Sequence, residues 1–203
     1  MAKQEIREPI QKRSIEKKQS IIKASYKLFS DKGYYKTNTA EIAQEAGVST
    51  GIVYNYFKDK KDILIEVIRF YISSLSEQFQ PLLSAPINKN YLPAMIEQFI
   101  DISIASHTMN MEAHNEFWAL SLLEKDILNL FNDFENAVLL KLYELLAAAG
   151  FSKTNLLEKV RISYGIVEQV CHYNIQQKLL QEELDTTRSL AIHTIVTLLN
   201  DTR

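Results

Sequence analysis

Residues 38–57 read NTAEIAQEAGVSTGIVYNYF, and this stretch decides the fold of the N-terminal part of the chain. Its spacing of apolar residues predicts two short helices, 38–46 and 49–57, joined by a tight turn. Gly47 lies in that turn, where a positive φ angle favours a residue without a side chain.

Start signals support both helices. Asn38 and Glu41 have the spacing of a capping box, and Ser49 is the expected N-cap of the second helix. A third helix is predicted upstream, at about 14–30. The apolar residues predicted to form a shared core are Ile42, Ala43, Ala46, Val48, Val53 and Phe57, with Leu28 and Phe29. This layout is a helix-turn-helix, whose second helix enters the major groove of DNA.

The exposed side of the second helix would present groups that suit DNA. Thr50 and Asn55 can hydrogen-bond to base edges, and Gly51 lets the backbone come near the DNA. The candidates for phosphate contact are Thr39, Tyr54, Tyr56 and Lys60.

The charge of the chain is divided unevenly. Residues 1–69 hold 14 Lys and Arg against 9 Asp and Glu, whereas the rest holds 9 against 16. Either the basic end meets a polyanion or the asymmetry is chance. Within the basic end, residues 1–10 are expected to be a solvated tail, and the group expected near DNA is Lys12, Arg13, Lys17 and Lys18.

The remainder of the chain is predicted to be helical. Glycine and proline are scarce, and no run alternates for a strand, so the predicted fold class is all-α. A helix over 60–80 should end at a break that Pro81 and Pro86 bracket. Further helices are predicted at about 91–109, 112–122, 124–149, 154–180 and 185–200. Asn155 and Glu158 again have the spacing of a capping box.

The segment IIKASYKLFSDKGYYKTNTAEIAQEAGVSTGIVYNYFKDKKDIL resembles the N-terminal domain of the TetR family of repressors. The matching features are a helix that ends in Leu-Phe, Gly33 before an aromatic residue, Ile42-Ala43, Ala46 to Ser49, Tyr54, Tyr56-Phe57 and Lys60. They cover about residues 15–65. The resemblance implies DNA contacts from Thr39, Ser49, Thr50, Gly51, Tyr54, Asn55, Tyr56 and Lys60.

The sequence departs from the family pattern at three positions. Asn38 stands where Thr is frequent, and Tyr56 stands where His is frequent. Ile52 replaces a small polar residue that often contacts phosphate, so it is left out of the predicted site. By resemblance, residues 1–60 form the arm and DNA-binding domain, and residues 61–203 form a helical effector-binding and dimerisation domain whose helix 61–80 is the connector.

The helices at 154–180 and 185–200 have broad apolar faces. These faces either pack against a second copy of the chain, as in the family, or complete the core of the protomer itself. A two-fold homodimer would place two recognition helices in successive major grooves, about 34–36 Å apart.

A mixture of aromatic, sulfur-containing and polar residues suggests an effector pocket in the body of the protein. Residues of this kind at helical spacing can equally be core. The candidates are Phe99, His107, Met111, His114, Phe117, Trp118, Tyr164, Glu168, Cys171 and His172. No spacing suits a metal, and no cofactor is predicted. Cys171, in a long helix, is expected to be buried.

These features predict a cytoplasmic, dimeric repressor that binds a palindromic operator in double-stranded DNA and is released by a small apolar or amphipathic effector. The alternative is a DNA-binding adaptor or structural protein whose body binds a protein partner, and a body cavity of a few hundred Å³ would favour the repressor. No catalytic constellation, phosphate loop or membrane-length apolar run is present, so neither an enzyme nor a membrane protein is expected. The single cysteine excludes an intramolecular disulfide.

Overall fold

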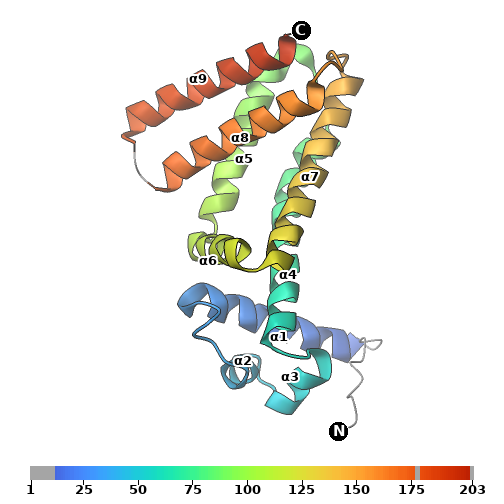
Figure 1. The fold of residues 1–203 in the computed structure, drawn as a ribbon, viewed down its shortest axis with the longest axis vertical. Coiled ribbons are helices and arrows are strands. Elements are labelled where there is room, and N and C mark those ends of the chain that lie inside the picture. The colour runs from blue at the N-terminus through green and yellow to red at the C-terminus, as the bar shows by residue number, and fades with distance from the viewer. Residues whose placement is uncertain (1–11, 177–178, 202–203) are drawn as a thin grey trace. The chain divides into compact units, whose positions relative to one another are not determined.

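The computed structural model describes residues 12–176 and 179–201, and it confirms the all-α fold class (Figure 1). No strand occurs within those two ranges. The α-helices are α1 (Lys12–Lys32), α2 (Thr39–Glu45), α3 (Thr50–Tyr56), α4 (Lys60–Ser84), α5 (Leu92–Thr108), α6 (Met111–Leu123), α7 (Lys125–Ala148), α8 (Leu156–Ile175) and α9 (Gln181–Asn200), and a 3-10 turn, η1 (Lys89–Tyr91), precedes α5.

The chain divides into two compact units. The first, here called the head, comprises the chain up to Ser73 together with Met111–Phe131. The second, here called the body, comprises Ser74–Asn110 and the chain from Asn132 onward. The division falls inside α4 and α7, so α6 is grouped with the N-terminal helices. The functional boundary near residue 60 stays a prediction.

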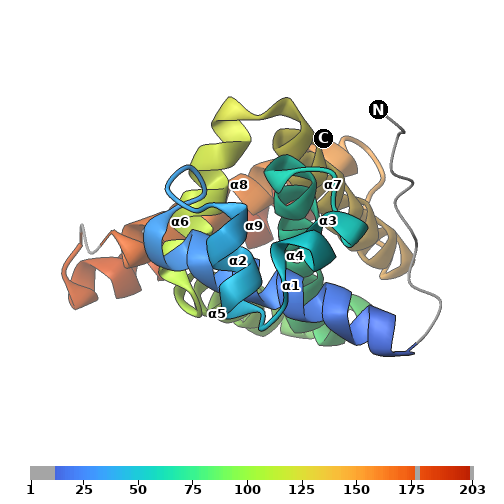
Figure 2. The same ribbon diagram turned by 90° about the horizontal axis from the view of Figure 1, so that it is seen from below.

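The head is built on the predicted core. Phe29 of α1, Ile42 of α2 and Val53 of α3 are fully buried, and Phe57 is 1% exposed. Ala46, Val48 and Leu28 are half-buried at the edge of this core. Figure 2 shows α2 and α3 lying against α1, as apolar faces at helical spacing require.

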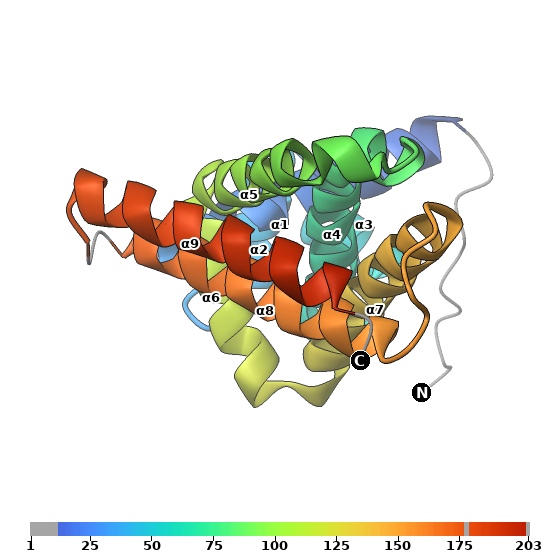
Figure 3. The ribbon, with the colours of Figure 1, turned by 90° about the horizontal axis from the view of Figure 1, so that it is seen from above.

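The body packs three helices side by side. Figure 3 shows α9 lying along α8, with α5 beside them. The fully or nearly fully buried residues of this core include Ile100, Leu156, Val167, Cys171 and Ile195. Cys171 has no exposed surface, as predicted. No helix among the described residues combines the length and the apolar character that crossing a membrane requires.

Three details of the predicted helices were wrong. Helix α4 continues through Pro81 to Ser84; Pro81 lies in its last turn, and the fixed φ of proline is compatible with a helix. Helix α9 starts at Gln181, since the Glu183 carboxylate accepts the Leu180 N–H at 2.8 Å and acidic residues suit a helix N-terminus.

The third concerns the start of α8. Asn155 makes no side-chain cap and adopts a left-handed conformation, with φ 52°. The predicted solvated tail at residues 1–10 and the part of helix 154–180 at residues 177–178 lie outside the described residues.

Candidate DNA-binding surface

The turn between α2 and α3 has the geometry that the sequence predicts. Gly47 has φ +67°, and nothing lies within 4 Å of the position that a Cβ atom would take there. The conformation, rather than crowding, therefore favours glycine. Asn38 and Glu41 form the capping box, with both hydrogen bonds at 3.0 Å. The Ser49 hydroxyl accepts the Ile52 N–H at 3.4 Å, so Ser49 is the N-cap of α3.

Helix α3 buries one face and exposes the other. Val53 faces the core, whereas Thr50, Gly51 and Asn55 are exposed. Tyr54 is 44% exposed. Ser49 is also exposed, and Ile52 is half-buried. The predicted base-reading residues thus share one accessible face.

Two tyrosine hydroxyls are held in place by neighbouring helices. The Tyr54 hydroxyl donates to Thr39 Oγ1 at 3.4 Å, which joins α3 to the first turn of α2. The Tyr56 hydroxyl lies 2.9 Å from Ser14 Oγ of α1. The structure therefore brings Tyr54 and Thr39, two residues predicted to contact DNA, together. The Tyr54 hydroxyl gives its proton to Thr39, and the Thr39 hydroxyl keeps its own proton for a phosphate oxygen.

Lys60 lies beneath the loop between α1 and α2. Its ammonium donates to the carbonyls of Tyr34 and Thr37, both at 2.9 Å, and lies 4.3 Å from the centre of the Tyr34 ring. Partial burial lowers the pKa of the Lys60 ammonium. An ammonium has three protons, so two hold the loop and one is left for a phosphate. The sequence predicted the phosphate role and missed the bonds to the loop.

Helix α6 supports the head from outside the helix-turn-helix. The Tyr34 N–H donates to Glu116 Oε1 at 2.6 Å, just after the turn that Gly33 makes with φ +89°. Lys61 forms ion pairs with Glu124 at 3.0 Å and with Asp126 at 2.9 Å, and these acidic groups raise its pKa. Sequence reasoning missed these contacts, since no local pattern links residues more than 60 positions apart.

The basic residues at the start of α1 lie on its exposed surface. Lys12, Arg13 and Lys17 are exposed. Lys18 is half-buried. Its ammonium lies 3.2 Å from the carboxylate of Glu66 on α4 and 5.9 Å from the centre of the Phe57 ring. Three of the four predicted cations are therefore accessible to a polyanion.

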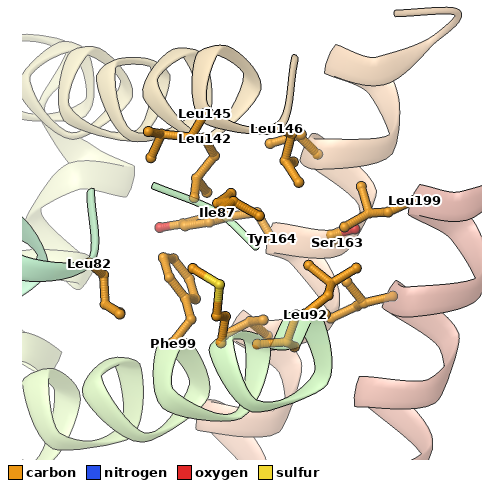
Figure 4. A pocket seen from close by; sticks show the side chains of 15 residues that line it. Leu82, Ile87, Leu92, Phe99, Leu142, Leu145, Leu146, Ser163, Tyr164 and Leu199 are labelled. Atoms are coloured by element: carbon orange, nitrogen blue, oxygen red, sulfur yellow. The ribbon is translucent and has the colours of Figure 1, made fainter. Parts of the chain in front are cut away.

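The body contains an apolar cavity of about 90 Å³. Figure 4 shows its lining, to which α5, α7, α8 and α9 contribute. The lining residues are Leu82, Ile87, Leu92, Met95, Ile96, Phe99, Leu142, Leu145, Leu146, Val160, Ser163, Tyr164, Val167, Ile195 and Leu199. Two predicted pocket residues, Phe99 and Tyr164, are among them.

The other predicted pocket residues lie elsewhere. In the body, His107 Nε2 lies 3.4 Å from the Glu168 carboxylate, and its ring makes an edge contact with the His172 ring. Cys171 is fully buried, and burial raises its thiol pKa to about 12. In the head, four predicted residues belong to α6. Two of them, Met111 and Trp118, are exposed. The third, His114, has its Nδ1 atom 3.1 Å from the Tyr71 hydroxyl. The fourth, Phe117, is buried against Tyr26 and Tyr71.

The buried polar network around Glu168 has a consistent electrostatic effect. Burial, the charge of Glu168 and a hydrogen bond to it raise the pKa of the Tyr164 hydroxyl far above its usual value. Burial opposes a charge on His107, but Glu168 and the Ser103 carbonyl, 2.7 Å from Nδ1, outweigh it and raise the pKa of the imidazole. Glu168 thus holds protons on two neighbouring groups.

An all-α chain with an exposed helix after a tight turn has the architecture of a helix-turn-helix DNA-binding protein. Residues 21–67 match the profile described as bacterial regulatory proteins, tetR family. Over this segment the chain is similar to the tetR family of regulators, as the sequence indicated.

Curated relatives resemble part of the sequence, and solved structures resemble the fold. The chain is 44% identical over 63 residues to the HTH-type transcriptional regulator HbdR of Aromatoleum sp. (strain CIB), which covers 31% of this chain and 28% of that protein. A TetR-family regulator from Mesorhizobium loti superposes with a TM-score of 0.71 at 17% identity, over 93% of this chain and 98% of its own. A regulator from Saccharomonospora viridis, solved in complex with choline, has a TM-score of 0.68 at 18% identity, over 89% and 96%.

The sequence matches are concentrated at the N-terminal end. The chain spans between 28% and 54% of the length of the curated relatives that it matches first. The structural likeness extends over the body as well, and at this level of identity it establishes the fold alone.

Proposed function

We propose that the protein is a repressor that binds a palindromic operator as a homodimer and releases it when a small apolar or amphipathic effector binds in the body. One observation carries the DNA-binding part. Thr50, Gly51 and Asn55 stand exposed on α3 while the opposite face of the helix is buried. Such a face is available to base edges without any loss of core packing. The protein would act in the cytoplasm, where its DNA lies.

Phosphate contacts would fix the register of this helix. Thr39, Tyr54, Tyr56 and Lys60 supply hydroxyls and an ammonium around α3, and Ser49 adds the N-cap hydroxyl. These groups are proposed to position the protein, whereas Thr50 and Asn55 select bases.

Selection of bound fragments from a random DNA pool, followed by titration of the selected DNA, tests this function. We expect the selected DNA fragments to contain a palindromic sequence. Tyr54→Ala and Lys60→Ala should bind it less tightly than the unmodified protein, and Lys125→Ala, an exposed lysine of α7, should bind it equally well. The slope of log affinity against log salt should become shallower by about 0.9 for each phosphate that a variant no longer neutralises. Unchanged affinity in both variants would refute the assignment.

Homodimerisation is proposed through α8 and α9. Ile162 of α8 is 54% exposed and Leu190 of α9 is 61% exposed, although neighbouring residues on both helices are buried. Exposed large aliphatic residues on paired helices favour burial against a second copy.

The alternative, a DNA-binding adaptor whose body binds a protein, also has an observation in its favour. The cavity of about 90 Å³ is smaller than the few hundred Å³ typical of ligand sites. Titration of the DNA complex with small apolar molecules separates the two functions, because only the effector-released repressor would dissociate.

A further inference from the structure

The cavity of the body contains one polar group that the protein itself leaves unsatisfied. Ser163 of α8 lines the cavity and is 9% exposed. Its hydroxyl has almost no contact with solvent and no hydrogen-bond partner, alone among the buried side-chain nitrogen and oxygen atoms of residues 12–176 and 179–201. Figure 4 shows Ser163 among the aliphatic side chains of the lining, beside Leu199.

Other buried serines on helices show what Ser163 lacks. Ser25 donates to the carbonyl of Ile21, and Ser103 donates to that of Phe99, both at 2.8 Å. Ser106 and Ser121 likewise donate to carbonyls one turn earlier. A buried hydroxyl without a partner is unfavourable, so its presence in a cavity requires an explanation.

We propose that the cavity binds a compact, neutral molecule with a hydrocarbon skeleton and a single hydroxyl or carbonyl oxygen, which hydrogen-bonds to the Ser163 hydroxyl. The inference rests on the proposed function, because it names the chemical class of the effector. The hydroxyl supplies the missing polar contact, and the aliphatic lining covers the remainder of the ligand.

The residues that line the cavity favour a neutral ligand over a charged one. Among the described residues, no Asp, Glu, Lys, Arg or His contributes to the lining, so a buried ammonium or carboxylate would have no counter-charge there. The second hydroxyl at the wall belongs to Tyr164, whose proton is retained because burial and the charge of Glu168 raise its pKa, whereas the Ser163 hydroxyl is the buried one without a hydrogen-bond partner. Ser163 is therefore the polar group available to a ligand.

The volume of the cavity limits the ligand to a compact molecule. An engineered apolar cavity of about 150 Å³ holds benzene, and this cavity, at about 90 Å³, is smaller. A skeleton of about six carbon atoms therefore approaches the upper limit without expansion of the walls.

A matched series of probes tests the inference on the full chain. Cyclohexanol, cyclohexane and cyclohexylammonium share a ring and differ in the group attached to it. Calorimetric titration should show that cyclohexanol binds more tightly than cyclohexane and that cyclohexylammonium does not bind. Binding of the ammonium as tight as that of the alcohol, or no binding of cyclohexanol, would overturn the proposal.

Ser163→Ala isolates the hydrogen bond. This variant should bind cyclohexanol roughly two- to tenfold more weakly and cyclohexane equally well, since one neutral hydrogen bond is removed. It should fold normally, because no partner loses a bond. Ser103→Ala, a buried serine of α5 outside the cavity lining, should leave both affinities unchanged. Equal weakening in the two variants would contradict a specific role for Ser163.

Val167→Leu provides a second variant, in which an added methylene fills part of the cavity. It should weaken cyclohexanol and cyclohexane alike, and unchanged binding of both would place the probes elsewhere and overturn the proposal. Release of the selected DNA is measured separately. Binding that depends on Ser163 without DNA release supports the cavity inference and contradicts the effector-released repressor.

Discussion

Lys60 joins two roles in a single side chain. Its ammonium donates to the carbonyls of Tyr34 and Thr37, and its remaining proton is proposed to contact a phosphate. The loop that it supports leads directly to Asn38, the N-cap of α2. A lysine at the start of α4 thus orders the entry to the helix-turn-helix before any DNA is bound.

Lys60→Met should lower the free energy of unfolding in urea by about 1–2 kcal/mol, since it removes two hydrogen bonds from a charged but partly exposed donor. Lys58→Met, two positions earlier and exposed, should change it by less than about 0.5 kcal/mol. If both variants unfold alike, the bonds to the loop contribute nothing to stability.

His107 should make the stability of the body depend on pH. Glu168 and the Ser103 carbonyl raise the pKa of His107 above its usual 6.5 in the folded protein, despite burial. The stabilisation is therefore fully present below about pH 6.5 and is lost as the pH rises through the higher folded pKa. The His172 ring makes an edge contact with His107, and burial together with the charge of Glu168 raises the pKa values of the neighbouring Tyr164 and Glu135.

Thermal unfolding as a function of pH measures this effect. His107→Gln should flatten the melting-temperature profile above pH 6.5, whereas His193→Gln, at an exposed position on α9, should leave its shape unchanged. A profile that keeps its slope in His107→Gln would assign the dependence to another group.

Among the elements, α6 connects distant parts of the sequence within the head. Glu116 accepts the buried N–H of Tyr34, immediately after the end of α1. A backbone N–H at this place has no helical acceptor, and the carboxylate satisfies it.

Glu116→Ala should therefore lower the free energy of unfolding by about 1–3 kcal/mol and speed hydrogen exchange at the Tyr34 amide. Glu116→Gln keeps an acceptor and should recover much of the loss, and Asn115→Ala, an exposed neighbour on α6, should have little effect. Slow exchange at Tyr34 in the alanine variant would show that another group satisfies this amide.

For the whole molecule, the proposed assembly depends on the exposed aliphatic residues of α8 and α9. Ile162→Glu and Leu190→Glu place charges on the proposed interface, where burial would leave them unpaired. Light scattering at micromolar concentration should then show a monomer, with weaker binding to a palindrome. Leu140→Glu, on an equally exposed residue of α7, should remain dimeric. A dimer in all three variants would exclude α8 and α9 as the interface.

The sequence by itself determined the class and location of most helices. The capping box at Asn38, the turn at Gly47 and the N-cap at Ser49 are local, because each depends on groups within three or four positions. Local patterns can also mislead, since Asn155 has the spacing of a capping box and adopts a left-handed conformation instead.

The tertiary structure alone decided which distant side chains meet. Lys60 beneath the loop, Glu116 at Tyr34 and the unsatisfied Ser163 hydroxyl depend on packing between helices. Only Phe99 and Tyr164 of the predicted pocket residues line the cavity, because an aromatic or sulfur-containing residue at helical spacing fits a core as well as a pocket. Periodicity specifies which face of a helix is buried, and the cavity forms where several such faces fail to fill the space between them.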